Sequence, residues 1–227
     1  VMQTKKLFDQ YGIEYNVLCV LTNPLAKHAK KVFDFFQQNH VKYVQFIPCL
    51  DEMNATSRSS YALTPERFAS FYQTYFRLWF DQLRKGSYQS VKLFDDAINQ
   101  FVRGRRTACG LDGQCQVQYV IEADGSVYPC DFFAVDQYRL GYIQDKTLRE
   151  LFSQPNTLNF LQMERKLPTY CENCPVKQYC CGGCRRMKDA MYVNQTGNFC
   201  GYQQLLSMVL TKSDTILKYV AQSYFVN

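Results

Sequence analysis

The stretch CENCPVKQYCCGGC at residues 171–184 determines how the second half of this chain is organised. Its cysteines follow the pattern Cys171-x2-Cys174-x5-Cys180-x3-Cys184, and such short spacings let one turn deliver two thiolates to a single metal centre. Two glycines stand directly before the last of these cysteines, and glycine lets the backbone approach a bound group closely. The stretch therefore indicates thiolate ligation of metal.

Other cysteines complete the pattern. Upstream, the spacing is Cys109-x5-Cys115-x14-Cys130, and a last cysteine follows at Cys200. With four from the central stretch, eight cysteines are available, enough for two sites of four thiolates each. Spacing alone neither divides them between two sites nor excludes a pair of structural zinc sites with four cysteines each.

Composition limits the class of protein. The chain has 227 residues and eleven cysteines, an odd number, and it starts without an apolar signal segment. Metal ligation is therefore favoured over disulfides, and the absence of any apolar run of 18 residues predicts a soluble, cytoplasmic protein that spans no membrane. The net charge of +6 comes from lysines and arginines that are spread along the chain, so we infer no nucleic-acid partner.

The first part of the sequence has the pattern of an α/β protein. Residues 15–21 and 43–47 are apolar and short enough to be buried strands, and between them Ala29, Val32, Phe33 and Phe36 share one helical face. Strand, helix and strand make a βαβ unit, which needs neighbours on both edges of its sheet. Only a helical turn or two precedes the first strand, so we expect the first half of a larger barrel to be missing. Thr64 and Pro65 predict the start of a helix that runs to about residue 83, and a further helix is expected over 91–102.

The pattern changes after about residue 105, where we place a domain boundary. Nine of the eleven cysteines lie beyond it, and periodic apolar residues give way to turns. Asp124-Gly125 predicts a β-hairpin between residues 117–122 and 126–128. Short helices are predicted over 148–152 and 158–165, and a terminal helix over 203–223, packed back on the barrel.

Three segments resemble a known family. Gly125-x4-Cys130 followed by the later cysteines is similar to the SPASM domain of radical S-adenosylmethionine enzymes. The segments QYVIEADGSVYPCDF (118–132), CRR (184–186) and QFIPCL (45–50) resemble its anaerobic sulfatase-maturating branch. The resemblance covers nearly the whole chain. It implies an α/β fold in which residues 1–105 form the C-terminal portion of a partial parallel (β/α) barrel with connecting helices. Residues 106–202 would form a cysteine-rich α+β SPASM domain with a β-hairpin, and residues 203–227 a C-terminal helix.

The resemblance also implies a division of the cysteines. In that family one auxiliary [4Fe–4S] cluster takes the first three cysteines and the fourth of the later group. The remaining four hold the second cluster. Carried over to this sequence, auxiliary cluster I has the ligands Cys109, Cys115, Cys130 and Cys184, and auxiliary cluster II has Cys171, Cys174, Cys180 and Cys200.

The implied activity is that of a radical S-adenosylmethionine oxidoreductase. The complete enzyme would oxidise a cysteine or serine of a sulfatase polypeptide to Cα-formylglycine, with S-adenosylmethionine, a third [4Fe–4S] cluster and an electron donor such as flavodoxin or ferredoxin. Asp131 matches the position of the family's catalytic base, and we expect it to be partly desolvated beside two phenylalanines.

The chain departs from the family in one respect. The CxxxCxxC loop that holds the radical cluster does not occur here, so we expect this chain alone to be inactive, and we assign no S-adenosylmethionine-binding residue. Two alternatives stay open, namely a maturase of another peptide in the same superfamily and a non-catalytic zinc or electron-transfer module.

Several reactive residues are predicted to have no role at these sites. Cys19 and Cys49 follow or lie in apolar strands and are expected to be small buried hydrophobes. Cys181 directly follows a predicted ligand and should point away from it, while His28 and His40 should be exposed. Arg185 and Arg186 are expected to offset cluster charge.

Overall fold

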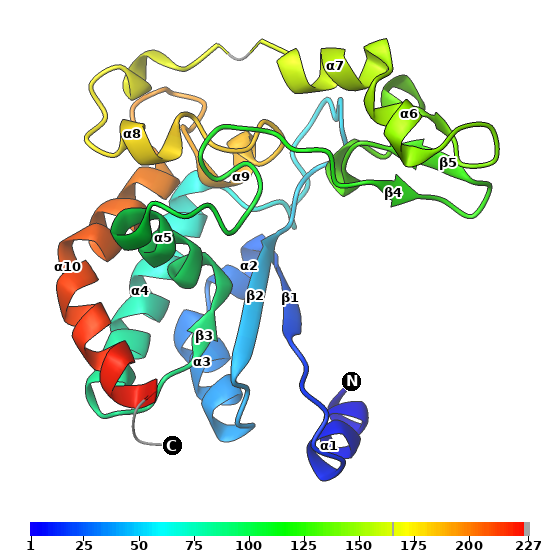
Figure 1. Cartoon of the computed structure of the whole chain (residues 1–227). Helices are drawn as coiled ribbons and strands as arrows, with labels where there is room; N and C mark the ends of the chain where they lie inside the picture. Colours follow the sequence, from blue (N-terminus) through cyan, green and yellow to red (C-terminus); the bar gives the residue numbers. More distant parts are fainter. Residues whose placement is uncertain (165, 225–227) are drawn as a thin grey trace.

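The computed structural model describes residues 1–164 and 166–224 of the chain (Figure 1). A three-stranded parallel sheet lies in the first part, with strands β1 (Val17–Leu21), β2 (Tyr43–Pro48) and β3 (Ser90–Val91) in that order. Val17 pairs with Val44, and Tyr43 pairs with Ser90. The predicted βαβ unit is therefore confirmed, with a third parallel strand beside it.

Helices connect these strands and cover one face of the sheet. The segment between β1 and β2 forms α2 (Asn23–Ala26) and α3 (Ala29–Gln38), α4 (Pro65–Arg84) links β2 to β3, and α5 (Lys92–Arg103) follows β3. The start of α4 is as predicted, because Thr64 accepts a hydrogen bond from the Arg67 amide at 3.2 Å and Pro65 occupies the first turn.

The core of this first part is aromatic. Phe46 of β2 meets Phe71 and Tyr75 of α4 edge-on, at ring-centroid distances of 4.9 and 5.1 Å. Phe94 of α5 has no exposed surface and packs 5.1 Å from the ring of Trp79. The long terminal helix α10 (Gly201–Tyr224) packs against α4 and α5, which confirms the predicted return of the C-terminal segment (Figure 1). We call the sheet, α2 to α5 and α10 the body.

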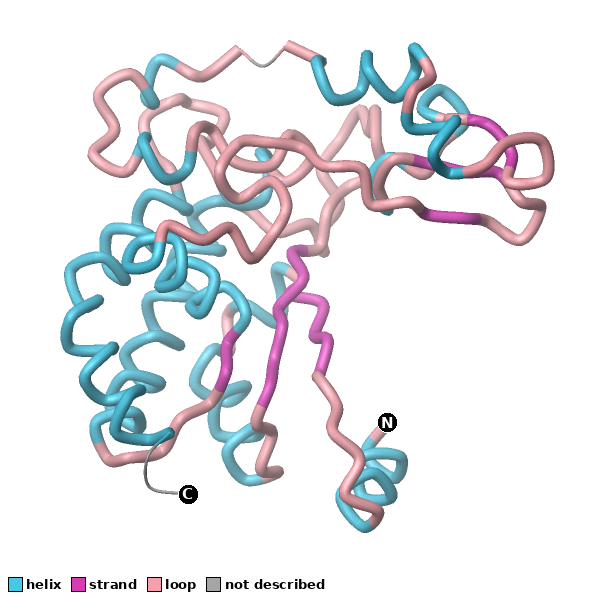
Figure 2. The backbone as a smooth tube through the Cα atoms, in the orientation of Figure 1, coloured by secondary structure: helices cyan, strands magenta, loops and turns pink. Residues whose placement is uncertain are grey.

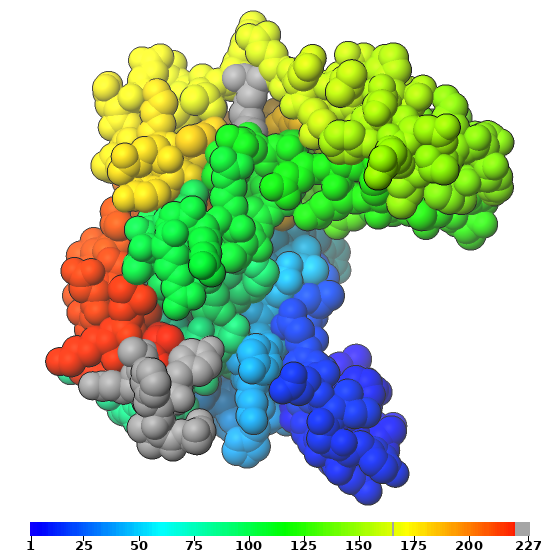
Figure 3. All heavy atoms as spheres, in the orientation of Figure 1, coloured from blue at the N-terminus to red at the C-terminus, as the bar shows by residue number. Residues whose placement is uncertain are grey.

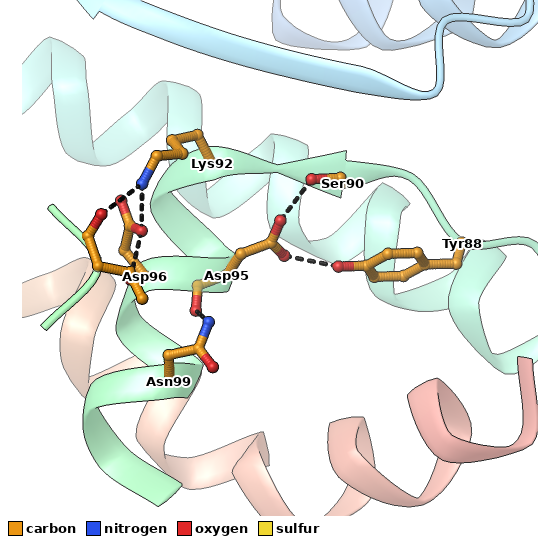
Figure 4. Close-up of polar contacts among 7 residues, drawn as sticks. Tyr88, Ser90, Lys92, Asp95, Asp96 and Asn99 are labelled. Atoms are coloured by element: carbon orange, nitrogen blue, oxygen red, sulfur yellow. Dashed lines mark hydrogen bonds and ion pairs between the residues drawn. The ribbon is translucent and has the colours of Figure 1, made fainter. Parts of the chain in front are cut away.

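A partly buried polar network lies at the start of α5 (Figure 4). Asp95 accepts hydrogen bonds from the Ser90 hydroxyl at 2.5 Å and the Tyr88 hydroxyl at 2.7 Å, and Asp96 accepts one from Thr107 and pairs with Lys92. Burial raises the pKa of Asp95 to about 6, although both hydroxyl bonds act in the opposite direction.

The second part contains a small antiparallel sheet. Its strands β4 (Val120–Ile121), β5 (Ser126–Tyr128) and β6 (Gly141–Tyr142) pair in that order. The turn between β4 and β5 has Gly125 at φ +83°, so the predicted Asp-Gly hairpin is confirmed, with a first strand shorter than expected. The fold class predicted from the sequence, a parallel α/β portion followed by a cysteine-rich portion with a hairpin, is thus observed.

Two helices complete this region. Helix α6 (Leu148–Phe152) is as predicted, and Thr147 and Glu150 form a capping box at its start. The second helix, α7 (Pro155–Gln162), begins three residues earlier than predicted because Pro155 suits the first turn. The predicted end at Arg165 lies outside the described residues. We call residues 117–162 the hairpin module. Its own apolar core consists of Val127, Leu140 and Leu151.

The remaining elements are short. They are α1 (Met2–Gln10), η1 (Asp131–Phe133), η2 (Asp136–Tyr138), η3 (Thr169–Cys171), α8 (Lys177–Cys180) and α9 (Lys188–Met191). Figure 2 shows that loops make up most of the region around η3, α8 and α9. Even so, Val176, Met191 and Cys200 belong to the same core as Phe94, so this region is packed onto the body.

The hairpin module projects from the body, and Figure 3 shows an open hollow beneath it on the side of β1. Helix α1 stands apart at the other end and buries no residue of its own. None of the helices over 1–164 and 166–224 combines the length and the apolar character needed to cross a bilayer.

Candidate metal centres

Cys109, Cys115, Cys130 and Cys184 come together from three separate segments. A Cβ atom added to Gly110 would lie 3.1 Å from Cys184 Cβ and 3.5 Å from its sulfur, so the 109–115 turn lies directly against Cys184. Burial raises the pKa of Cys184, and the nearby Cys115 and Cys109 thiols raise it further. The pKa of Cys130 is raised to about 12, mainly by burial and then by Asp131 and Cys184. We call these four residues the first cysteine set.

Cys171, Cys174, Cys180 and Cys200 form a second cysteine set. Burial raises the pKa of Cys180 to about 12 and that of Cys200 to about 11, and in both cases Cys171 and Cys174 add to the shift. Cys200 lies just before α10, in a β-bridge with Val193. All four thiols line one cavity of about 870 Å³.

Tyr192 links the two sets. Its hydroxyl accepts a hydrogen bond from the Cys184 amide at 3.0 Å, and its ring lies so close to Gly183 that a Cβ there would come within 2.0 Å. Burial raises the pKa of Tyr192, and Tyr202, Cys180 and Cys184 contribute in the same direction. One buried tyrosine therefore touches the backbone of the first set and lies near a thiol of the second.

The chemistry of these residues suits a metal centre. Closely spaced thiols raise one another's pKa because neighbouring thiolates repel, and a bound cationic core would relieve this repulsion while displacing the protons. Within 1–164 and 166–224, no three His, Cys, Asp or Glu side chains are close enough together to hold a single metal ion. Thiolates around one zinc ion would each lie about 2.3 Å from the metal. The described cysteines are not arranged closely enough for such a site.

Asp131 lies beside the first set but is more open than the sequence predicted. Its side chain is exposed, so the expected partial desolvation is wrong for this structure. The carboxylate accepts hydrogen bonds from the Phe132 amide at 2.9 Å and the Cys130 thiol at 3.2 Å. Phe133, in the same short helix η1, is buried and lines the 870 Å³ cavity. Asp131 is thus exposed and lies two residues before a residue that lines the cavity.

The two arginines after Cys184 have different partners. Arg185 donates from Nε to the sulfur of Cys115 at 3.2 Å, whereas Arg186 donates to the carbonyl oxygen of Asp51 in the loop after β2. Both arginines line the large cavity. Of these two arginines, it is Arg185 that contacts a sulfur of the first set.

The residues predicted to have no role at these sites are placed as follows. His28 and His40 are exposed, as predicted, and Cys19 and Cys49 are half-buried. Cys181 is exposed, adopts a left-handed backbone conformation with φ +44° and donates to the Gln178 carbonyl at 3.6 Å. Sequence reasoning missed Tyr192. The two glycines before Cys184 signal a close approach, but they do not say what approaches.

Comparisons with known proteins agree with this arrangement. The SPASM family model, an iron-sulfur cluster-binding domain, matches residues 109–175. The chain is 37% identical over 191 residues to the cysteine-type anaerobic sulfatase-maturating enzyme of Clostridium perfringens, covering 84% of this chain and 52% of the relative. Over most of its length, the chain is therefore similar to anaerobic sulfatase-maturating enzymes.

A more distant member and a solved structure extend the comparison. The serine-type enzyme of Klebsiella aerogenes is 28% identical over 207 residues, which cover 90% of this chain and 49% of that protein. The solved structure of native anSMEcpe with bound AdoMet and Kp18Cys peptide superposes with a TM-score of 0.80 at 31% identity, covering 99% of this chain and 61% of that one. The chain spans about half the length of the curated relatives it matches.

Proposed function

We propose that this chain forms part of a radical S-adenosylmethionine enzyme that oxidises a cysteine or serine of a sulfatase to Cα-formylglycine, and that it holds two auxiliary [4Fe–4S] clusters. The observation that carries the proposal is the gathering of eight cysteines into two sets of four. Similarity to relatives of both the cysteine and the serine type supports the reaction.

The first cysteine set would hold auxiliary cluster I and the second set auxiliary cluster II. Each pKa shift that a set member owes to other thiols comes from members of the same set, which supports this division. We call residues 171–184 the knuckle. Cys130 belongs to the hairpin module, whereas Cys184 belongs to the knuckle. A shared cluster would therefore tie the module to the body.

When bound, these clusters would supply acceptors for the electron that leaves the substrate carbon, and S-adenosylmethionine with a third cluster would supply hydrogen abstraction in a complete enzyme. Flavodoxin or ferredoxin would serve as the electron donor in the cytoplasm. The oxidation of the substrate also releases a proton. Asp131 would accept this proton on a carboxylate oxygen beside the cavity. Its exposure leaves that carboxylate within reach of a bound peptide.

The part of the 870 Å³ cavity that the second cysteine set does not line is the proposed peptide site. Buried Phe133 and half-buried Tyr138 line it near Asp131, and Leu50 and Met53 of the loop after β2 also line it. In the related anSMEcpe structure the bound molecules include a peptide named Kp18Cys. Because identity is higher to the cysteine-type relative than to the serine-type one, we propose a cysteine as the residue modified.

The test uses a complete enzyme that contains these residues, reduced and supplied with S-adenosylmethionine and a sulfatase peptide. Asp131→Asn should still form 5′-deoxyadenosine, whereas formylglycine should fall by about 10²- to 10⁴-fold, the usual effect of losing a general base. Asp136→Asn is the matched control, because Asp136 is also exposed and pairs with Arg139. Residues 1–227 alone serve as the blank, since their sequence contains no CxxxCxxC loop.

Other outcomes would change the assignment. Unchanged aldehyde formation by Asp131→Asn, with its iron intact, would move the base elsewhere. Formation of 5′-deoxyadenosine by the parent enzyme without formylglycine on cysteine or serine peptides would favour a maturase of a different peptide.

A further inference from the structure

Arg185 occupies a special position among the cationic side chains around the first cysteine set. Its Nε lies 3.2 Å from the sulfur of Cys115, and it is half-buried between the knuckle and the hairpin module. Arg185 lines both the large cavity and a smaller one of about 440 Å³ that also contains Cys115. Arg185 therefore borders two cavities and its guanidinium group contacts a proposed ligand.

The hairpin module holds this side chain in place. Nη2 of Arg185 donates to the Phe160 carbonyl at 2.6 Å, and Nη1 lies 3.5 Å from the Met163 carbonyl. These carbonyls are at the C-terminal end of α7, where the helix dipole favours a cation. The guanidinium carbon also lies 4.8 Å from the centre of the Phe160 ring. Three donor nitrogens of a rigid fork are thus used at once, so Nε is directed at sulfur without freedom to turn away.

A hydrogen bond of this kind affects the redox chemistry of a cluster. Reduction adds one electron to the cluster, and part of the added negative charge appears on the ligand sulfurs. A fixed cation that donates to one of these sulfurs stabilises the reduced form more than the oxidised form, because charge-assisted hydrogen bonds strengthen with the charge of the acceptor. The reduction potential is therefore higher with the bond than without it.

We propose that Arg185 is a positioning residue that raises the reduction potential of auxiliary cluster I through its hydrogen bond to Cys115, with α7 fixing its geometry. This inference rests on the proposed function, since it requires a cluster in the first cysteine set. The contact between Arg185 and the Phe160 carbonyl of α7 would then help to set the reduction potential of the cluster. A shift of the hairpin module would move the donor away from the sulfur.

The neighbouring arginine provides the control. Arg186 has the same charge one residue further along, is equally half-buried, and donates to the Asp51 carbonyl. If only net charge near the cluster mattered, the loss of either arginine should have a similar effect. If the bond to sulfur matters, the effect of Arg185 should be distinctly larger.

The experiment is an anaerobic redox titration with dithionite, followed by electron paramagnetic resonance, on the full 227-residue chain with reconstituted clusters. For Arg185→Gln we expect one of the two potentials to fall by about 59 mV, equivalent to a tenfold change in the one-electron equilibrium, while the other stays unchanged. Arg185→Lys should give a smaller fall, because lysine keeps the charge but cannot bond to sulfur and to α7 simultaneously. Arg186→Gln should leave both potentials close to those of the parent.

Three results would overturn the inference. The first is an Arg185→Gln variant with full iron content and parental potentials. The second is an equal fall for Arg185→Gln and Arg186→Gln. The third is the loss of half of the iron from both Arg185 variants, which would make Arg185 a structural support for the site. If only Arg185→Gln loses iron, the Arg185→Lys variant tests the inference instead. Iron–thiolate bands in its resonance Raman spectrum that are unchanged from those of the parent would then count against the proposal. A parent chain that binds zinc and no iron would instead reject the proposed function.

Discussion

The body and the hairpin module differ in the amount of apolar surface that they bury. In the body, α4 and α5 bury a continuous set of aromatic rings against a parallel sheet, and Phe94 and Trp79 are at most 1% exposed. The hairpin module has strands of two or three residues and an apolar core of Val127, Leu140 and Leu151. The same chain therefore contains one region with a large apolar core and one with a small core, for which we expect metal ligation to add stability.

The contacts between the two regions support this contrast. The module reaches the rest of the molecule through Cys130 of the first cysteine set, through the carbonyls that Arg185 binds, and through the Gln137 amide that contacts Met53 sulfur at 3.4 Å. Most of these contacts are polar or involve thiols. Their strength should consequently depend on what the thiols bind.

Removal of iron should have the largest effect and should act unequally on the two regions. Metal ligation contributes on the order of 10 kcal/mol to the folding of small metal-dependent domains. After chelation, amides of the small sheet such as Leu140, which bonds to the Val127 carbonyl at 2.8 Å, should exchange hydrogen much faster. Amides within α4 should keep their protection. Hydrogen exchange read by mass spectrometry measures this difference, and an equal loss of protection in α4 would break the comparison.

A matched pair of core truncations should give the next largest effect. Phe94→Ala removes a ring in contact with Tyr72, Phe76 and Trp79, and should cost about 3–5 kcal/mol of the free energy of unfolding of the body. Trp79 is the only tryptophan, so its fluorescence during urea unfolding reports on this region. Phe133→Ala in the module should leave that transition nearly unchanged while increasing hydrogen exchange in β4 to β6. A similar shift of the Trp79 transition in both variants would mean that the two regions unfold as one unit.

The smallest of these effects concerns Asp95, a half-buried carboxyl group within the body. Burial raises its folded-state pKa from 3.8 to about 6, so the folded chain binds this proton more tightly than the unfolded chain. The resulting stabilisation is complete below about pH 4 and is lost as the pH rises through about 6.

The variant Asp95→Asn stays neutral and should lack this dependence. Relative to Asp95→Asn, the parent should lose up to about 3 kcal/mol of unfolding free energy between acidic and neutral pH. Urea unfolding monitored through Trp79 at several pH values measures the difference. Asp81→Asn on the exposed side of α4 is the control. A parent and an Asp95→Asn variant that change in parallel with pH would show that Asp95 ionises freely.

Local sequence patterns were sufficient for most of the fold. Short apolar runs predicted β1 and β2, the Thr64-Pro65 pair predicted the start of α4, and Asp124-Gly125 predicted the hairpin. Each of these signals acts over a few neighbouring residues. Helix α7 begins earlier than predicted because Pro155 starts it, three residues before the apolar residues that indicated the helix. The core also extends from Phe94 across residue 105 to Cys200, and no local pattern reports such a contact.

The candidate site was less accessible to sequence reasoning. Spacing identified eight candidate ligands but not their division, because 40 residues separate Cys130 from Cys171 and the first set takes its last member from the far side of that gap. Similarity to a known family supplied the division. The exposure of Asp131 and the burial of Tyr192 beside Cys184 depend on how distant segments meet. Neither could follow from the residues around them.

The central claim is that eight cysteines form two four-thiolate sites for iron–sulfur clusters, and quantification of iron, sulfide and zinc after anaerobic reconstitution tests it most directly. The parent should bind about eight iron and eight sulfide per chain. Cys130→Ala and Cys174→Ala should each retain about half of this iron, and Cys181→Ala should retain all of it. Stoichiometric zinc without iron in the parent, or equal iron losses for Cys181→Ala and Cys174→Ala, would contradict the account.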